Sequence, residues 1–199
     1  MRENNINQDI GAIGCELLDI NKQPTVSWGN FPSLKSEFTY FSKKILEKFW
    51  VDKKQNLFVN NKSFEVDYII GADLFIPNDV LQKIGYFDPS FFMYYEETDL
   101  QKRMANSSYK RIIIEGPKII HIEGASRSLK SKLSYNRFVL NINSFFLYIN
   151  KHFNGIDKFI YKFVAFFIRL TLVFDKRYSL SEKISGVKLI FKLTFGLKI

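Results

Sequence analysis

The chain has 199 residues, of which 46% are hydrophobic and 25% are charged, and these values exclude a wholly disordered protein. This length accommodates one domain with its own core, or one domain with an appended segment. The single cysteine, Cys15, excludes an internal disulfide and a cysteine-based zinc site, which fits a reducing compartment. The polar start (MRENN) has no apolar core, so we expect no signal peptide.

The net charge of +9 is confined to one part of the sequence. Residues 1–130 contain 17 Lys/Arg and 17 Asp/Glu, whereas residues 131–199 contain 12 basic and 3 acidic residues. Residues 131–199 also hold 15 of the 33 aromatic residues. We therefore predict a neutral body at residues 1–130 and a basic, aromatic tail at residues 131–199, with different roles.

The first predicted elements are extended segments with a helix between them. Residues 10–18 (IGAIGCELL) predict a short buried strand whose glycines permit close packing. Apolar side chains at three- and four-residue spacing predict a helix at residues 36–48. Residues 64–70 are strand-like, and residues 73–76 predict a second extended piece that Pro77 ends.

Two helices are predicted next. We expect Asn78 to cap a short helix at residues 79–84, with Gly85 as its left-handed C-terminal cap. A second helix is predicted at residues 97–106, because Leu100 and Met104 share one face.

Two β-branched strands are predicted at residues 111–114 and 118–122, separated by Gly116 and Pro117.

The sequence of the tail predicts helices at residues 135–153 and 156–174, and residues 187–199 continue the same pattern. In the second helix the cations fall within a stripe of roughly 40° at about 100° per residue. They are Lys158, Lys162, Arg169 and Lys176. The longest uncharged run, residues 163–168, is far shorter than the ~20 residues that a spanning helix needs.

A narrow cationic stripe on a wide Phe/Ile/Leu surface is typical of a helix that lies in a bilayer interface, so we expect an anionic membrane surface as a partner. Basic, aromatic tails can also bind nucleic acid, but the many aliphatic residues here do not favour a base-stacking surface. A buried helical hairpin is the third interpretation.

The most informative stretch is residues 91–100 (FFMYYEETDL), in which Glu96, Glu97 and Asp99 follow a wall of large apolar and aromatic side chains. Such a wall implies burial or a cleft, where close like charges raise one another's pKa, and a carboxylate of this kind suits a general base. The alternative is that the acids only decorate a helix N-terminus, which favours negative charge by ~0.3–1 kcal/mol.

His121 ends a predicted strand and leads into a glycine loop (HIEGAS, residues 121–126). Ligands of open α/β sheets bind at such strand ends. A single strand histidine is more commonly a structural residue, and both interpretations stay open. The sequence contains no Gly-rich phosphate loop and no Asp-x-Asp pair that could hold a divalent metal on a diphosphate.

Four ordered motifs resemble the C-terminal half of family 2 glycosyltransferases of the GT-A fold, especially the rhamnosyltransferase-like members that build bacterial surface polysaccharides. They are DIGAIG with LLD (residues 9–19), VDYIIGA (66–72), IGYFD followed by FFMYYEETDL (84–100), and HIEGAS (121–126). The resemblance covers residues 8–150. It implies an α/β fold with a partial GT-A, Rossmann-like mixed sheet that forms the acceptor-binding half, followed by the helical tail.

The resemblance also implies a reaction: inverting transfer of a sugar, with rhamnose as a candidate, from a nucleotide sugar to a lipid-linked or polysaccharide acceptor. Glu97 matches the family's base, which takes the proton of the acceptor hydroxyl. His121 matches a position that can complete the shell of a divalent metal, Mg²⁺ or Mn²⁺, around the donor diphosphate. The implied acceptor-binding positions are Gly71, Ala72, Asp88, Glu96 and Asp99.

Two departures from the family pattern matter. Glu97 stands where Asp is usual, so its carboxylate reaches one methylene further. The nucleotide-binding half with its Asp-x-Asp motif is missing from residues 1–199, so we expect either a fragment of a longer enzyme or a chain whose partner supplies that half.

We therefore expect a glycosyltransferase whose donor site is incomplete in this chain, located in the cytoplasm as a peripheral protein on the inner face of the plasma membrane, with no nucleic-acid partner. The alternatives are a non-catalytic interaction module of a polysaccharide-assembly complex and a basic nucleic-acid-binding protein.

Overall fold

The computed structural model describes residues 9–46, 63–122 and 132–196, and the chain forms two compact units. The sheet unit comprises Met1–Phe31, Asp52–Pro89 and Glu96–Ala125. The helical unit comprises Pro32–Val51, Ser90–Tyr95 and Ser126–Ile199. The chain is therefore mixed α/β, and each unit is described by itself.

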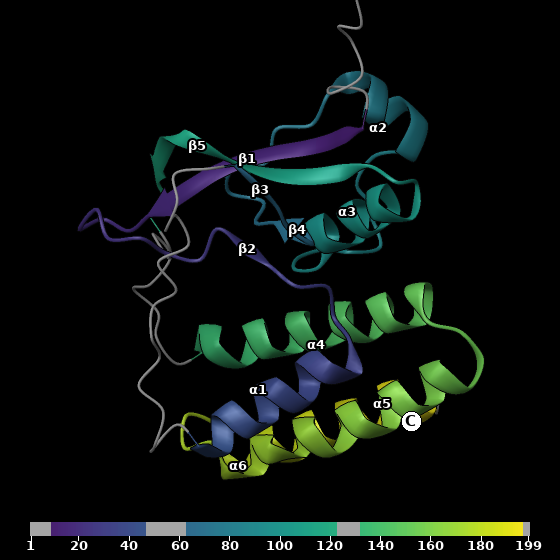
Figure 1. Ribbon diagram of the computed structural model, residues 1–199. Coiled ribbons are helices and arrows are strands. Elements are labelled where there is room, and N and C mark those ends of the chain that lie inside the picture. Colours follow the sequence, from purple (N-terminus) through teal and green to yellow (C-terminus); the bar gives the residue numbers. More distant parts are fainter. Residues whose placement is uncertain (1–8, 47–62, 123–131, 197–199) are drawn as a thin grey trace, which may run out of the picture. The chain divides into compact units, whose positions relative to one another are not determined.

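The sheet unit is built around two long strands, β1 (Ile10–Leu18) and β5 (Lys110–Ile120), which pair in parallel (Figure 1). A short strand, β3 (Phe64–Glu65), pairs antiparallel with β5, which gives the order β1-β5-β3. On its other edge β1 forms an antiparallel bridge through Ile13 and Phe75. The predicted strand at residues 10–18 is confirmed.

The two strands predicted at residues 111–114 and 118–122 are one strand, β5. Gly14 pairs with Ile113 and Glu16 with Lys118, so the register shifts where the prediction placed the break. Gly116 has a φ of 111°, which a glycine adopts readily, and the bulge absorbs the break without ending the strand.

A second, two-stranded sheet pairs β2 (Trp28–Gly29) antiparallel with β4 (Tyr68–Ile69). The strand predicted at residues 64–70 is thus divided into β3 and β4. The helices of this unit are α2 (Asn78–Ile84) and α3 (Glu96–Asn106), and α3 contacts β1, β4 and β5. The buried core consists of Ala12, Val66, Ile69, Val80, Leu100, Met104 and Ile113.

Both predicted caps of α2 differ from the structure. The N-cap is Pro77, and Asn78 is the first helical residue, with no side-chain cap hydrogen bond. Gly85 has a positive φ of 85° but a ψ of 170°, so its backbone is extended and not left-handed helical. Its N–H donates one hydrogen bond, to the Leu81 carbonyl.

Cys15 lies on β1 and is buried. Its backbone N–H donates to the Asp73 carboxylate (2.6 Å), which ties β1 to the segment that follows β4. Burial raises the pKa of the thiol to about 12, and the neighbouring Asp73 carboxylate acts in the same direction.

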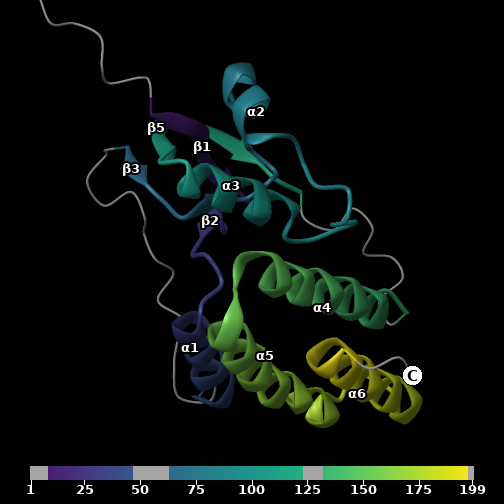
Figure 2. The ribbon, with the colours of Figure 1, turned by 90° about the vertical axis from the view of Figure 1, so that its right-hand side faces the viewer.

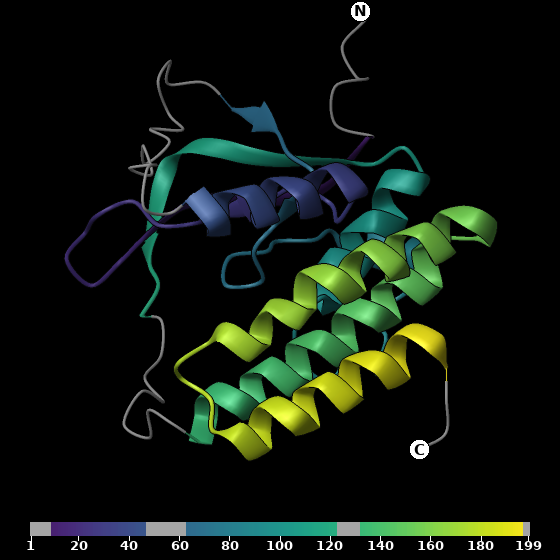
Figure 3. The same cartoon turned by 90° about the horizontal axis from the view of Figure 1, so that it is seen from below.

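The helical unit contains α1 (Leu34–Leu46), α4 (Lys132–His152), α5 (Gly155–Leu170), a 3₁₀ turn η1 (Thr171–Phe174) and α6 (Leu180–Phe195). The last three α-helices lie side by side (Figures 2 and 3). Their shared core consists of Ile142, Phe145, Phe146, Ile149, Tyr161, Ala165, Leu172 and Ile190. Within the described residues, no helix is long and apolar enough to cross a bilayer.

Local sequence explains two features of this packing. Ser179 and Glu182 form a reciprocal capping box at the start of α6, and Gly196 ends that helix in the left-handed conformation. A Cβ atom at Gly186 would overlap the Leu172 side chain, so glycine is needed where α6 meets η1. The tail is helical as predicted, with α6 beginning well before residue 187.

The two compact units do not divide at residue 130, where the sequence predicts the end of the body. Helix α1 and the loop Ser90–Tyr95 belong to the helical unit, although both precede residue 130. The physical reason is that α1 packs on α5, and that the loop packs on α4 through the Tyr95 ring, which lies 5.9 Å from Phe145 between centroids.

A buried ion pair joins α1 to α5. The Arg169 Nη1 lies 2.9 Å from Glu37 Oε2, and its Nη2 donates to Oε1 at 3.2 Å. The guanidinium also stacks over the Phe145 ring, 4.5 Å from its centroid. Arg169 therefore does not belong to a solvent-facing cationic stripe with Lys158, Lys162 and Lys176, because it points into the helical unit.

Candidate active site

The acidic run begins helix α3, where Glu96, Glu97 and Asp99 lie in the first turn. The two residues before it, Tyr94 and Tyr95, have positive φ values of 68° and 66°. Non-glycine residues seldom adopt this conformation, which costs about 1–3 kcal/mol each and concentrates at functional sites. The local backbone therefore favours a site over simple decoration of a helix end.

The aromatic wall that precedes the acids is divided between two environments. Phe91 is buried and Lys151 lies over its ring, 5.6 Å from the centroid. Tyr95 packs against Tyr148, and the Ser144 hydroxyl donates to the Met93 carbonyl at 2.8 Å. Phe92, in contrast, is 80% exposed. Contacts within the helical unit thus hold this loop in its strained conformation.

The pKa of the Glu97 carboxylate is raised above its ordinary value. Desolvation by burial raises its pKa, and the charge of Glu96 raises it further, while backbone N–H groups at Glu97, Thr98 and Gly71 act in the opposite direction. Among the described residues, neither Glu96 Oε2 nor Glu97 Oε2 has a hydrogen-bond partner, although both atoms are buried. A buried carboxylate oxygen with unused acceptor capacity can receive a proton from a ligand.

Gly71 and Tyr68 lie against Glu97. A Cβ built on Gly71 would come within 3.8 Å of the Glu97 Cβ, which is ordinary van der Waals contact. Burial raises the pKa of the Tyr68 hydroxyl, and the negative charge of Glu97 contributes. A Cβ at Gly29 would overlap the Tyr68 ring, so the glycine lets β2 cross over that side chain. Tyr68 was not among the predicted site residues.

Asp99 lies apart from Glu97 on α3, because residues two apart on a helix point about 200° from each other. Its side chain is 0% exposed and pairs with Arg103 (3.1 Å), whose Nη1 and Nη2 donate to the carbonyls of Ile84 and Tyr86. The pair anchors the loop after α2 to α3, and the acceptor-binding role of Asp99 stays a prediction.

Gln101 also has a positioning role, and the sequence analysis did not predict it. Its amide accepts from the Ile69 N–H (2.7 Å) and donates to the Ile69 carbonyl (2.8 Å), so it fixes α3 to strand β4. The same nitrogen donates to the Glu97 carbonyl at 3.1 Å. Only the spacing of four residues from Glu97 pointed to it.

The remaining predicted site residues are placed as follows. Ala72 is exposed next to Gly71, and Asp88 is half-buried in the loop between α2 and α3. His121 directly follows β5, where its N–H donates to the Leu18 carbonyl at 2.8 Å. The structure brings Gly71 together with Glu97, and the charge of Glu96 acts on the same carboxylate.

The implied metal has no ready-made site in the part of the chain that the structure describes. No group of three or more His, Cys, Asp or Glu side chains is arranged there to hold a cation. The described residues, including His121, therefore do not form a complete metal site by themselves.

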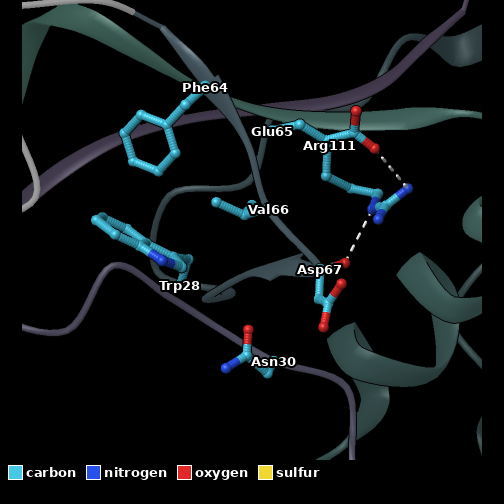
Figure 4. Close-up of a pocket in the computed structure, with 7 residues that line it drawn as sticks. All are labelled: Trp28, Asn30, Phe64, Glu65, Val66, Asp67 and Arg111. Carbon is cyan, nitrogen blue, oxygen red and sulfur yellow. Dashed lines mark hydrogen bonds and ion pairs between the residues drawn. The ribbon is translucent and has the colours of Figure 1, made fainter.

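A separate concave region lies beside the short strands (Figure 4). Its volume is about 530 Å³, and it is lined by Trp28, Asn30, Phe64, Glu65, Val66, Asp67 and Arg111. The Trp28 and Phe64 rings meet edge to face at 4.9 Å, and the buried Arg111 donates to the Asp67 carbonyl. None of these residues was predicted as a site residue.

Substituting Glu97 by glutamine is expected to raise the thermal unfolding midpoint of the chain at neutral pH. Because the folded state raises the pKa of Glu97, the buried charge opposes folding above the folded-state pKa, and this opposition vanishes below the unfolded-state pKa. The gain should therefore disappear as the pH is lowered. Far-UV circular dichroism melts across a pH series would measure it.

Glu115→Gln, which changes an exposed glutamate on β5, is the matched control and should leave the midpoint unchanged at every pH. If Glu97 only stabilised the N-terminus of α3, Glu97→Gln would instead lower stability by about 0.3–1 kcal/mol. A lower midpoint would thus contradict the buried-base interpretation.

Comparison with family models and with curated proteins found no match to this sequence. The function is therefore argued from the residues.

Proposed function

We propose that this chain is the acceptor-binding half of an inverting glycosyltransferase with a partial GT-A fold, and that Glu97 is its catalytic base. The observation that carries the proposal is the Glu97 carboxylate, which is desolvated, lies against Gly71 and keeps a buried oxygen without a partner among the described residues. The strained Tyr94 and Tyr95 immediately before it support a functional role.

The chemistry follows from the raised pKa. A carboxylate with a pKa closer to neutrality is a better proton acceptor than an ordinary glutamate. In the proposed step Glu97 takes the proton of an acceptor hydroxyl. The oxygen then forms the new bond to the anomeric carbon, while the bond from that carbon to the nucleoside diphosphate breaks on the opposite side with inversion.

Glu96 and Tyr68 have supporting roles in this proposal. The charge of Glu96 keeps the Glu97 pKa high, and the Tyr68 hydroxyl lies near the same carboxylate. Gln101 and the Asp99–Arg103 pair hold α3 and the loop that carries Asp88. Ala72 and Asp88 remain proposed acceptor contacts, and His121 remains a proposed contributor to a metal shell in a complete enzyme.

We further propose that a nucleotide-binding half, on a partner chain or another segment, supplies the donor site, because residues 1–199 contain no Asp-x-Asp pair. The substrate classes follow from the resemblance: a nucleotide sugar and a lipid-linked or polysaccharide acceptor. The proposed location is the inner face of the plasma membrane, with the helical unit in contact with lipid.

The chain by itself is expected to bind nucleotide sugars weakly or not at all. Titration calorimetry with UDP- and dTDP-sugars in the presence of Mn²⁺ would measure this. The chain joined to the nucleotide-binding half of a family 2 glycosyltransferase, called here the complemented enzyme, should bind the donor and transfer its sugar to a lipid-linked acceptor.

Micromolar donor affinity of the chain alone would contradict the incomplete donor site. A complemented enzyme that binds donor and acceptor yet transfers no sugar would contradict the catalytic proposal. That second result would support the other candidate, a non-catalytic module of a polysaccharide-assembly complex, which the missing phosphate-binding motifs favour.

A further inference from the structure

Helix α5 has an apolar stripe that the described residues of its own unit do not cover. Ile156, Phe159, Ile160, Phe163 and Phe167 are all exposed, and at about 100° per residue they fall within a stripe of roughly 100°. The opposite side of α5 is already buried in the core through Tyr161, Ala165 and Ile168. A helix on the surface of a globular bundle normally carries polar residues where this stripe lies.

Helix α6 continues the apolar surface. Leu180, Ile184, Phe191 and Phe195 are exposed and fall within roughly 60° on that helix. Figure 3 shows α5 and α6 side by side. Both helices therefore present apolar side chains that are exposed in the part of the helical unit that the structure describes.

Ring contacts join the two stripes into one surface. The series runs from Phe159 to Phe163 (6.1 Å), Phe167 (4.9 Å), Phe166 (5.3 Å) and Phe195 (5.6 Å), as centroid distances. Phe191 then lies 4.8 Å from Phe195. We call Phe159, Phe163, Phe167, Phe191 and Phe195 the aromatic face. Contiguous apolar surfaces of this kind mark sites of association.

The charges around this face are mainly basic, with the exposed Asp157 on α5 as an acid near its edge. Lys188 and Lys192 are exposed on α6, within roughly 60° of the edge of its apolar stripe. Residues 131–199 contain 12 basic residues and only 3 acidic ones. Two of these acids are engaged locally: Asp175 pairs with Arg177 (2.6 Å), and Glu182 closes the capping box of α6.

We propose that the aromatic face, flanked by Lys188 and Lys192, is the surface on which the protein lies in the interface of an anionic membrane. Phenylalanine and aliphatic side chains bury into the boundary between headgroups and acyl chains, and the ammonium groups meet anionic lipids. This inference rests on the proposed membrane location and replaces the stripe that included Arg169, since that residue is buried against Glu37.

Charge complementarity favours lipid over the other occupants. A second copy of the chain placed on the same face would bring two surfaces with the same basic excess together, and repulsion between like charges opposes that contact. A nucleic acid would meet the lysines but would leave the aliphatic residues of both stripes uncovered.

Co-sedimentation of the full chain with vesicles tests the inference. The chain should bind vesicles that contain phosphatidylglycerol and should bind pure phosphatidylcholine vesicles more weakly. Phe163→Glu combined with Phe191→Glu should lower binding at least ~10-fold, because two apolar insertions are lost. Lys188→Gln combined with Lys192→Gln should lower binding to anionic vesicles by about 30-fold and leave binding to neutral vesicles unchanged.

Ile20→Glu, at an exposed apolar residue of the sheet unit, is the matched control and should bind like the unsubstituted chain. Circular dichroism would verify that each variant is folded. If the unsubstituted chain binds neither vesicle, the proposed membrane location fails. If it binds and the phenylalanine variant binds equally well, the location stands and this face is wrong.

Two further measurements separate the other occupants. Sedimentation velocity would detect a dimer that the phenylalanine substitutions dissociate, and a gel-shift panel would detect nucleic-acid binding that the lysine substitutions abolish. The inference would be overturned if the substitutions abolish dimerisation or nucleic-acid binding but leave vesicle binding unchanged.

Discussion

Glu97→Gln is expected to lower sugar transfer by the complemented enzyme at least ~100-fold, the lower end of what a general base contributes. The amide keeps nearly the same shape but cannot accept a proton from the acceptor hydroxyl. Donor binding should be unchanged, because the nucleotide site lies on the other half. Transfer rates under saturating donor and acceptor, together with a donor titration, would separate the two quantities.

Glu97→Asp is the matched control, since the family that the sequence resembles usually has aspartate at this position. It should retain most of the activity, and its rate should rise with pH through the pKa of the remaining carboxylate. A Glu97→Gln enzyme that turns over at the unsubstituted rate would remove Glu97 from the role of base. An enzyme that loses donor binding as well would indicate a structural defect.

Arg169→Met is expected to destabilise the helical unit by about 3–5 kcal/mol, because it leaves the Glu37 carboxylate buried without its bidentate partner. Most domains are stable by only ~5–15 kcal/mol, so a large fraction of that stability would be lost. Urea unfolding followed by circular dichroism, fitted with separate transitions for the two units if two appear, would measure the change.

A double substitution that removes both charges tests whether the unpaired Glu37 carboxylate causes the loss of stability. Glu37→Leu combined with Arg169→Met should recover most of the lost stability, because the uncompensated charge is gone and the site stays apolar. Arg177→Met breaks the exposed pair with Asp175 and should cost at most about 1 kcal/mol. Equal losses for Arg169→Met and Arg177→Met would show that burial of the first pair has no energetic consequence.

The strands and helices were largely predictable because their signals are local. The run IGAIGCELL became β1, and the acidic run became the first turn of α3. The break at Gly116 was misleading, since a bulge allows β5 to continue past a residue pair that usually ends a strand. Local breakers give the position of an irregularity but do not specify whether the strand ends there.

The candidate site was predictable only in part. Glu97 and Gly71 were predicted because each lies in a distinctive motif, and the structure places them next to each other. Tyr68 and Gln101 were missed because the interactions of Tyr68 with Glu97 and of Gln101 with Ile69 join β4 to α3 across 29 and 32 positions in sequence. A tyrosine in a strand and a glutamine in a helix carry no local sign of such a partner.

The least predictable feature of the tail helices was which side of each helix faces the core. A helical wheel places Arg169 beside Lys158 and Lys162, but α5 is apolar on two sides, and only tertiary packing decides which side faces the core. The partner of Arg169 is Glu37 on α1, which comes from the part of the sequence that was assigned to the body.

The chemistry of Cys15 has a practical consequence. A thiol with a pKa near 12 is almost entirely protonated at physiological pH, and it is buried, so maleimides and other alkylating reagents should spare it. Since the chain contains no other cysteine, one introduced on the surface would be the sole reactive thiol. Environment-sensitive dyes or spin labels can then be attached at a chosen position of α5 or α6 without first deleting a native residue.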